Sequence, residues 1–434
     1  MPIYTYTAKN NVGGTVSGDV EARNRETAVG LLKNQGFTVV SIKEKTAGFS
    51  DILSDFKNVP QGEVATFTRQ LSTMVSAGLP IARALEVLSS QSTNSKLKKI
   101  ISVSDLNNVF FDFQGKVEII DWGIEFKNCK NLIFDGVIVR MGDSAVLKTN
   151  KGKRPKNSIG LDCFNLDFCE NILIKNSSLS FGCDELLSVT HCKNVHVINT
   201  LFSFPLGGNP LTHPYGENHA ECINSSANES LCISACTFAY YRMRGPQFEA
   251  NDTIKDKFSV NMQVSNSLMH AFSTSACRMY GNEKDNEFKN NSYKFQFLSN
   301  VQSNVNEIDS NNLILCDLQY GTDKDKVRVF LDSNYNFRFS KKKFNKTLTN
   351  LGYNGKPKED ILSKKKLFTF ECCEPYSGEI DYEYILSIIN NSGTSDNFDQ
   401  KIRNCIINDI QKNKDLVCTF QSKKDAINYI DKNQ

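Results

Sequence analysis

Four short apolar strings recur along the middle of the chain, and they constrain its fold more than any other feature. Three of them open on a cysteine, a charged residue and an asparagine, and the fourth is looser: CKNLIFDGVIV, CENILIKNSSL, CKNVHVINTLF and NESLCISACTF. The leading cysteines are spaced 40 and 23 residues apart. This indicates a coil of about two dozen residues that tolerates insertions on one side. A repeat built from strands alone predicts a parallel β-helix, in which each coil stacks on the one before.

The cysteines that open these strings share one position in the repeat. Cys129, Cys169 and Cys192 each come directly before a polar pair and an apolar strand. We therefore expect them to stack as a ladder inside the β-helix. Zinc binding is the alternative interpretation of the cysteines, because zinc sites use tight clusters of thiolates. The close pairs that it would use are Cys232/Cys236 and Cys372/Cys373.

Composition separates the first hundred residues from the rest. All 14 cysteines follow residue 100, and residues 1–100 carry 12 basic and 8 acidic side chains, against 39 and 40 in the remainder. The net charge of +3 is too small to favour nucleic acid or a membrane surface as a partner. The chain opens without a basic and apolar leader, and it has no run of 18 apolar residues. We therefore expect no signal peptide, no membrane span and a cytoplasmic location, where thiols stay reduced.

The first hundred residues divide into three parts. Residues 1–46 predict a small α/β unit, with alternating strands around a Gly-Gly turn and a helix that ends at Gly36. Residues 47–60 have the composition of a linker. Residues 61–100 predict helices, because their apolar side chains recur with helical spacing.

Two strings in this N-terminal part carry a resemblance to a known family. YTYTAKNNVGGTVSGDVEA and FTRQLSTMVSAGLPIARALEVLSSQ resemble the cytoplasmic N-terminus of the inner-membrane platform protein of type II secretion and type IV pilus machines. The resemblance covers about residues 1–100, and the further helices and membrane spans of that family do not follow it. It implies a docking module whose partners are secretion or pilus machinery proteins.

Acidic and basic side chains recur on three consecutive coils of the predicted β-helix. In chain order they are Asp162, then Asp184, Glu185 and Ser188, and then Arg242 and Arg244. Carboxylates on neighbouring coils would lie about 4.8 Å apart and would repel each other unless a cation lies between them. Hard oxygen ligands suit Ca²⁺. The sequence therefore predicts a calcium site beside arginines that attract an extended, anionic substrate.

Two structural interpretations compete with this site. Asp162 and Asp184 are each suited to capping loops at the ends of strands. The two arginines have Glu249 and Glu185 as candidate partners for surface salt bridges.

The same segments resemble the pectate lyases of the single-stranded β-helix superfamily over about residues 105–412. The strings that carry this resemblance are KNLIFDGVIVRMGD, LDCFNLDFCENILIKNSSLSFGCDELLSV, HPYGENH, FAYYRMRGPQ, NEFKNNSYK and NNSGTSDNFDQKIRNCIINDI. The resemblance implies a mainly β protein, with a right-handed parallel β-helix over residues 101–345 and a C-terminal extension with helices over residues 346–434. Proteins of this type are usually secreted.

The resemblance also implies a role for each candidate residue. It places the catalytic group on Arg244 with Arg242 beside it, and it assigns calcium to Asp162, Asp184, Glu185 and Ser188. It places substrate binding on His213, Tyr215 and Gln247. The implied partner is an acidic polysaccharide such as polygalacturonate. The implied reaction is calcium-dependent β-elimination, in which the metal acidifies the C5 proton and stabilises an enolate-like transition state.

Three departures from that family leave other functions open. The string GGNPLTHPYG contains no lysine ahead of the turn, Gln247 stands where an arginine is common, and Ser188 stands where some members have a carboxylate. A β-helix that binds acidic glycans without cleaving them is therefore a second hypothesis. The third is a component of a secretion or pilus machine that acts through residues 1–100.

Overall fold

The computed structural model describes two compact units, Met1–Pro60 and Gln61–Gln434, and we describe each by itself. The described residues are 3–9, 15–21, 25–34, 36–44, 69–70, 88, 105–121, 123–156, 161–207, 209–214, 221–249, 259–273, 276–280, 292–303, 316–319, 327–338, 343–346, 351–353, 356–357, 363–370, 373–412 and 420–434. The helices predicted over residues 61–100 lie outside these ranges, apart from Arg69, Gln70 and Leu88.

The first unit is a three-stranded antiparallel sheet with one helix. Its elements are β1 (Ile3–Lys9), β2 (Thr15–Glu21), α1 (Arg25–Asn34) and β3 (Thr38–Glu44), and the strand order is β2-β1-β3. Leu32 of α1 and Ile42 of β3 are buried together, and Tyr6 and Phe37 pack against them. This arrangement agrees with the small α/β unit that the sequence predicts over residues 1–46.

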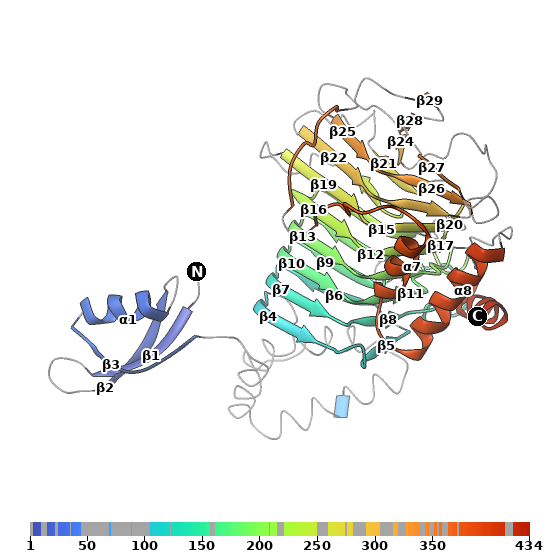
Figure 1. The fold of residues 1–434 in the computed structure, drawn as a ribbon. Helices are drawn as coiled ribbons and strands as arrows, with labels where there is room; N and C mark the ends of the chain where they lie inside the picture. The colour runs from blue at the N-terminus through green and yellow to red at the C-terminus, as the bar shows by residue number, and fades with distance from the viewer. Residues whose placement is uncertain are drawn as a thin grey trace. The chain divides into compact units, whose positions relative to one another are not determined.

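The second unit is a parallel β-helix built from three sheets (Figure 1). The first sheet contains β4 (Asn107–Asp112), β7 (Lys130–Asp135), β10 (Glu170–Lys175), β13 (Lys193–Ile198), β16 (Ser230–Ser234), β19 (Ser259–Ser265), β22 (Ser292–Leu298) and β25 (Val327–Asp332). Each strand pairs in parallel with the strand one coil further along the chain, for example β10 with β13. This pairing confirms the predicted fold class.

The second and third sheets follow the same rule. The second sheet contains β5 (Glu118–Ile120), β8 (Ile138–Arg140), β11 (Ser178–Ser180), β14 (Leu201–Ser203), β17 (Thr237–Tyr241), β20 (Leu268–Phe272), β23 (Val301–Ser303), β26 (Tyr335–Arg338) and β27 (Lys343–Lys346). The third contains β6 (Ile124–Lys127), β9 (Phe164–Asp167), β12 (Glu185–Thr190), β15 (Glu221–Ser226), β18 (Gln247–Glu249), β21 (Cys277–Tyr280), β24 (Cys316–Gln319), β28 (Leu351–Tyr353) and β29 (Lys356–Pro357). Only β27 and β29, at the far end, pair antiparallel among these described strands.

Stacked side chains fill the interior of the coils. Cys129, Cys169 and Cys192 are all buried as free thiols, and the Cys169 backbone N–H donates to Cys192 Sγ over 3.4 Å. This confirms the predicted cysteine ladder. On the next coil Asn228 continues it, because its Oδ1 accepts from the Cys192 N–H over 2.6 Å.

Helices of the C-terminal extension pack on the second sheet. They are α7 (Tyr382–Asn391), α8 (Asn397–Lys412) and α9 (Lys423–Asn433), and a short helix α6 (Ser144–Thr149) follows β8. Tyr240 of β17 donates to Asp409 of α8 over 2.6 Å, and Thr237 donates to Ser392, at the end of α7, over 3.0 Å. Of the helices in the described part of the chain, none combines the length and the apolar character needed to span a membrane.

Candidate functional site

Four acidic side chains gather where strands of the third sheet begin. Glu185 and Glu221 open β12 and β15 and are paired in register, and Asp162 lies just ahead of β9. One carboxylate oxygen each of Asp162, Asp184 and Glu185 lies within 4.8 Å of the others. The three metal carboxylates predicted from the sequence are therefore brought together. We call these three residues and Glu221 the acidic cluster.

The backbone around the acidic cluster holds the carboxylates in place. The Glu185 N–H donates to Asp162 Oδ1 over 3.0 Å, which ties one coil to the next. Gly123 lies against Asp162, and a Cβ at residue 123 would come within 1.8 Å of the Asp162 carbonyl oxygen. Only glycine therefore allows the two chain segments to approach this closely.

Burial and crowding raise the pKa values of carboxylates in the acidic cluster. Burial, and then the charge of Asp184, raise the pKa of Asp162 to about 7 and raise the pKa of Glu185 well above its ordinary value. Burial also raises the pKa of Glu221 to about 8, although Arg244 opposes the shift. Burial and like charges both disfavour the ionised carboxylate. A cation between the carboxylates would relieve both effects.

Arg244 lies beside the acidic cluster and contacts two of its members. Its Nη1 donates to Glu185 Oε1 over 2.9 Å and also forms an ion pair with Glu221. The structure therefore contains the Arg244–Glu185 ion pair, which is one of the two salt bridges considered from the sequence. The two carboxylates are almost fully buried, so this ion pair is not a surface contact.

The turn after β17 aims Arg244 at the carboxylates. Arg244 has a left-handed backbone with φ of 62°, and its carbonyl accepts hydrogen bonds from the N–H groups of Cys222 and Ile223. The following Gly245 packs on Tyr241, whose ring would lie 2.7 Å from an added Cβ. Left-handed backbone is uncommon for residues other than glycine. The hydrogen bonds to β15 hold Arg244 in this conformation.

The structure places the other predicted arginine and the predicted histidine near the same cluster. The positive charge of Arg242 contributes to lowering the pKa of Glu221, against the larger effect of burial, and the Arg242 carbonyl accepts from the Ser273 N–H over 3.3 Å. His213 is buried, and its Nε2 lies 3.2 Å from Asp184 Oδ2. Tyr215, the second residue predicted to bind substrate, lies outside the described residues.

Ser188 and Gln247 lie further along the third sheet, in a polar row on its outer face. The row comprises Glu125, Asn165, Ser188, Asn224, Gln247 and Arg278, which are in register from strand to strand. Their neighbours Leu187 and Val189 point into the core, and side chains alternate between the two faces of a strand. Gln247 Nε2 donates to Asn224 Oδ1 over 3.3 Å. These two residues therefore line the sheet beside the cluster, and their predicted roles in metal and substrate binding stay predictions.

Glu221 is the member of the acidic cluster that the sequence analysis missed. It is in register with Glu185, and both residues precede a buried strand. The signal was present, because GCDELLSV and HAECINSS place an acidic residue at the same point of the repeat. The segment between β14 and β15 differs in length from the other insertions, so the equivalent positions of Glu185 and Glu221 could not be aligned from the sequence.

The donor set fits a hard divalent cation. Asp162, Asp184 and Glu185 offer only carboxylate oxygens, which calcium prefers and which soft metals do not. Burial, and then the negative charge of neighbouring carboxylates, raise the pKa values of Asp162 and Glu185. Arg244 neutralises part of this charge from one side.

Comparisons with known proteins match the N-terminal part of the chain. Residues 1–43 match the family of the type II secretion system protein F N-terminal domain, and residues 67–103 match the type II secretion system protein F family. The type IV pilus assembly protein PilC of Thermus thermophilus is 36% identical over 104 residues, and that of Myxococcus xanthus is 33% identical over 99 residues. These matches cover 23% of this chain and 26% and 24% of the relatives, so the chain spans about a quarter of their length. The N-terminal resemblance seen in the sequence is thereby confirmed.

Solved structures of pectate lyases are among the structural matches to the chain. A thermostable pectate lyase, PL 47, gives a TM-score of 0.35 at 9% identity and covers 70% of this chain and 74% of its own. A pectate lyase from Paenibacillus sp. 0602 gives a TM-score of 0.39 at 12% identity, covering 71% and 81%. Structural similarity with TM-scores this low gives no evidence about function. The β-helix itself is established by the strand pairings.

Proposed function

We propose that the β-helix is a calcium-dependent polysaccharide lyase that cleaves polygalacturonate-like chains by β-elimination. The observation that supports this most is the convergence of three carboxylates within 4.8 Å, with Arg244 bound to one of them. A negatively charged cluster next to a guanidinium suits a substrate whose own carboxylate needs both a cation and a hydrogen-bond donor. Uronate residues carry such a carboxylate at each sugar.

Asp162, Asp184 and Glu185 would hold the calcium ion. Bound calcium would neutralise the uronate carboxylate and so make the C5 proton more acidic. Arg244 donates to carboxylates in this structure, and a substrate carboxylate or enolate oxygen presents the same chemistry. A guanidinium is a donor with no accepting atom, so we assign Arg244 to the stabilisation of the charge that develops in the transition state. The role as proton acceptor that the family resemblance implies is the alternative.

A non-catalytic β-helix that binds acidic glycans is the second candidate. Arg244, the proposed catalytic group, already forms ion pairs with Glu185 and Glu221, and this favours the second candidate. The absence of a lysine from GGNPLTHPYG favours it as well. In this alternative the acidic cluster would bind calcium and glycan without bond cleavage.

The test uses the full chain with demethylated polygalacturonate, with and without calcium. Ultraviolet absorbance follows the unsaturated uronate product, and isothermal titration calorimetry follows glycan binding. We expect turnover with calcium, no turnover with a chelator, and loss of calcium binding in Asp184→Asn. Arg328→Ala, an exposed arginine on β25, serves as the control and should keep full activity. Calcium-dependent binding without product would overturn the lyase and support the second candidate, and no binding at all would overturn both.

Residues 1–100 support a separate proposal, because they match protein F and PilC families. We infer that this part docks on secretion or pilus machinery. The test is co-purification of the full chain with an assembled machine, compared with a chain that lacks residues 1–60. Loss of co-purification in the shortened chain is expected, and equal recovery of both chains would contradict the inference.

A further inference from the structure

A segment of the C-terminal extension crosses the outer face of the first sheet. We call residues 363–370 and 373–381 the strap (Figure 1). Gln296 of β22 accepts from the Leu367 N–H over 2.6 Å and donates to the Phe368 carbonyl over 3.1 Å. Gln263 of β19 donates to the Cys373 carbonyl over 2.7 Å. The side chains of the sheet therefore bind the strap through its backbone.

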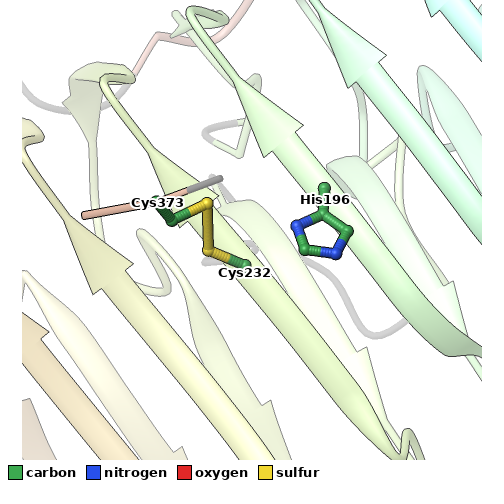
Figure 2. Close-up of side chains that lie close together, drawn as sticks. All are labelled: His196, Cys232 and Cys373. Carbon is green, nitrogen blue, oxygen red and sulfur yellow. A yellow bond between two sulfur atoms is a disulfide. The ribbon is translucent and has the colours of Figure 1, made fainter. Parts of the chain in front are cut away.

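The strap brings Cys373 to two residues of the first sheet. His196 of β13 and Cys232 of β16 are paired in register on neighbouring coils. Figure 2 shows His196, Cys232 and Cys373 together, with the two cysteines joined by a disulfide and the imidazole beside them. One ligand atom of each residue lies within 4.8 Å of the others. Cys232 and Cys373 are 141 residues apart in the sequence.

The imidazole of His196 is held in the tautomer that binds metals. Its Nε2 lies 2.9 Å from Asn194 Oδ1, an acceptor, so Nε2 carries the proton and Nδ1 is the unprotonated nitrogen. In Figure 2 the nitrogen next to the substituted ring carbon, Nδ1, is the one on the side of the two sulfur atoms. Metal-binding histidines usually donate their other ring N–H to an oxygen acceptor in this way.

We propose that His196, Cys232 and Cys373 bind a zinc ion when the two cysteines are reduced. The disulfide in the structure is then the oxidised, metal-free state of the same site. Two thiolates and one imidazole are a donor set that zinc prefers over calcium or magnesium. Three protein ligands leave the fourth tetrahedral position to water or to an exogenous ligand. The site is independent of the acidic cluster and of the function proposed for it.

The conversion of the disulfide to the zinc-bound state needs a small thiol and zinc, and no other reactant. Two molecules of a small thiol such as glutathione give two electrons and two protons to the disulfide. The products are the thiols of Cys232 and Cys373 and one oxidised disulfide of the small thiol. Zinc then displaces the two thiol protons to water and is itself neither oxidised nor reduced. In either state a bond or an ion holds Cys373 of the strap on the first sheet.

The test is a titration of the full-length, reduced chain with Co²⁺ under anaerobic conditions, followed by exchange with Zn²⁺. We expect a thiolate-to-cobalt charge-transfer band that saturates at one cobalt per chain, and loss of that band when zinc is added. Oxidised chain should bind neither metal at this site, and peptide mapping should recover a Cys232–Cys373 disulfide. Absence of the band in the reduced chain would overturn the proposal.

Single substitutions identify the ligands. Cys232→Ser, Cys373→Ser and His196→Ala should each weaken cobalt binding by more than about tenfold. Two controls should leave binding unchanged. The first is Cys236→Ser, a buried thiol whose Sγ donates to the Ser234 carbonyl over 3.3 Å. The second is Cys372→Ser, the sequence neighbour of the proposed ligand. Retention of the band in Cys232→Ser, or its loss in either control, would contradict the assignment.

A second measurement uses the wild-type chain, so it tests the zinc site even if the variants fail to fold. The reduced wild-type chain is treated with iodoacetamide with and without zinc, and each labelled cysteine is identified by mass spectrometry. Zinc should slow the labelling of Cys232 and Cys373 at least about tenfold and leave the labelling of Cys277 unchanged. Equal protection of all three thiols would show general tightening of the fold and would overturn the zinc site.

Discussion

Two clusters of carboxylates around an arginine lie on this β-helix, and they differ in how their charges are matched. In the acidic cluster Arg244 contacts Glu185 and Glu221. Between the second sheet and α8, Arg140 contacts Asp399, Asp396 and Glu118 at distances of 2.7 to 2.9 Å. We call this second group the Arg140 clasp, because it ties β8 to the C-terminal helices.

Hydrogen bonds satisfy the buried carboxylate of the Arg140 clasp, while Arg140 Nε is buried without a hydrogen-bond partner among the described residues. Asp399 Oδ1 accepts from Arg140 and from the Ser178 hydroxyl, and Oδ2 accepts from the N–H and the hydroxyl of Thr394. The ring of Phe398 lies 4.7 Å from the Arg140 guanidinium and covers it. Buried charges are tolerated only when the geometry is good and additional hydrogen bonds satisfy most of their polar atoms. The clasp is therefore a structural element.

The acidic cluster lacks that balance. Burial and the charge of Asp184 raise the pKa of Asp162 to about 7, and they raise the pKa of Glu185 as well. The same residue types thus give a clasp where charges and donors match, and a candidate binding site where carboxylates are in excess. Perturbed pKa values of this kind are common at functional sites. The predictions that follow separate the two cases.

The largest expected effect comes from breaking the clasp. Arg140→Met leaves Asp399 buried without its cation and should lower the free energy of unfolding by about 3–5 kcal/mol. Urea unfolding at neutral pH measures this. Glu118→Gln removes a partner whose side chain is 38% exposed, and it should cost less than about 1 kcal/mol. Similar small losses for both variants would show that the clasp does not hold the C-terminal helices.

Removal of the corresponding arginine from the acidic cluster should act on activity more than on stability. Arg244→Ala should lower the turnover of polygalacturonate about a hundredfold or more, because one contact to the transition state is lost. Its unfolding free energy should fall less than that of Arg140→Met, since Glu185 and Glu221 already favour the protonated form. Calcium binding should be retained. Full activity of Arg244→Ala in the product assay would remove this residue from the mechanism.

Calcium should matter more to stability at high pH than at low pH. The folded chain raises the pKa of Asp162 from 3.8 to about 7, so between these values it binds more protons than the unfolded chain. Stability without calcium should therefore fall as the pH rises from about 4 to about 7. Calcium bound to the ionised folded form should reverse that loss. Melting temperatures at several pH values, with calcium or a chelator, measure the effect, and Asp162→Asn should flatten the slope.

The smallest effect belongs to a neutral ladder on the outer face of the first sheet. Asn171 Nδ2 donates to Asn131 over 2.8 Å, and its Oδ1 accepts from Asn194 over 2.9 Å. Asn171→Gly keeps the left-handed backbone, where φ is 57°, and removes these bonds. It should cost about 1 kcal/mol in urea unfolding. A loss as large as that of Arg140→Met would show that buried charge is not what distinguishes the clasp.

The fold was predictable because its signals are local and repeated. Each coil carries its own apolar strand and lead-in, so Cys129, Cys169 and Cys192 could be aligned from the sequence and are indeed stacked. The proximity of Asp162, Asp184 and Glu185 was predictable for the same reason, since Asp162 and Glu185 occupy the same point of two coils. The strands of residues 1–46 also follow their local pattern.

Apart from the pair of Arg244 with Glu185, the partners of the charged side chains were not predictable. Glu221 was missed because the segment before β15 differs in length from the other insertions, so its position in the repeat was hidden. Ser188 lies in register with Asn165 and Asn224, and its predicted role as a metal ligand stays a prediction. A shift of a few residues along a strand changes which side chains meet, and spacing in the sequence does not contain that register.

By itself, the sequence determined the parallel β-helix, its cysteine ladder and the N-terminal α/β unit. Their physical cause is short-range, because strand periodicity and turn residues act within each coil. Only the tertiary structure decided which distant groups meet. Arg140 reaches Asp399 across 259 residues, and Cys232 reaches Cys373 across 141. These contacts depend on where the C-terminal helices and the strap pack against the sheets, and burial and electrostatics act there between segments that no local pattern connects.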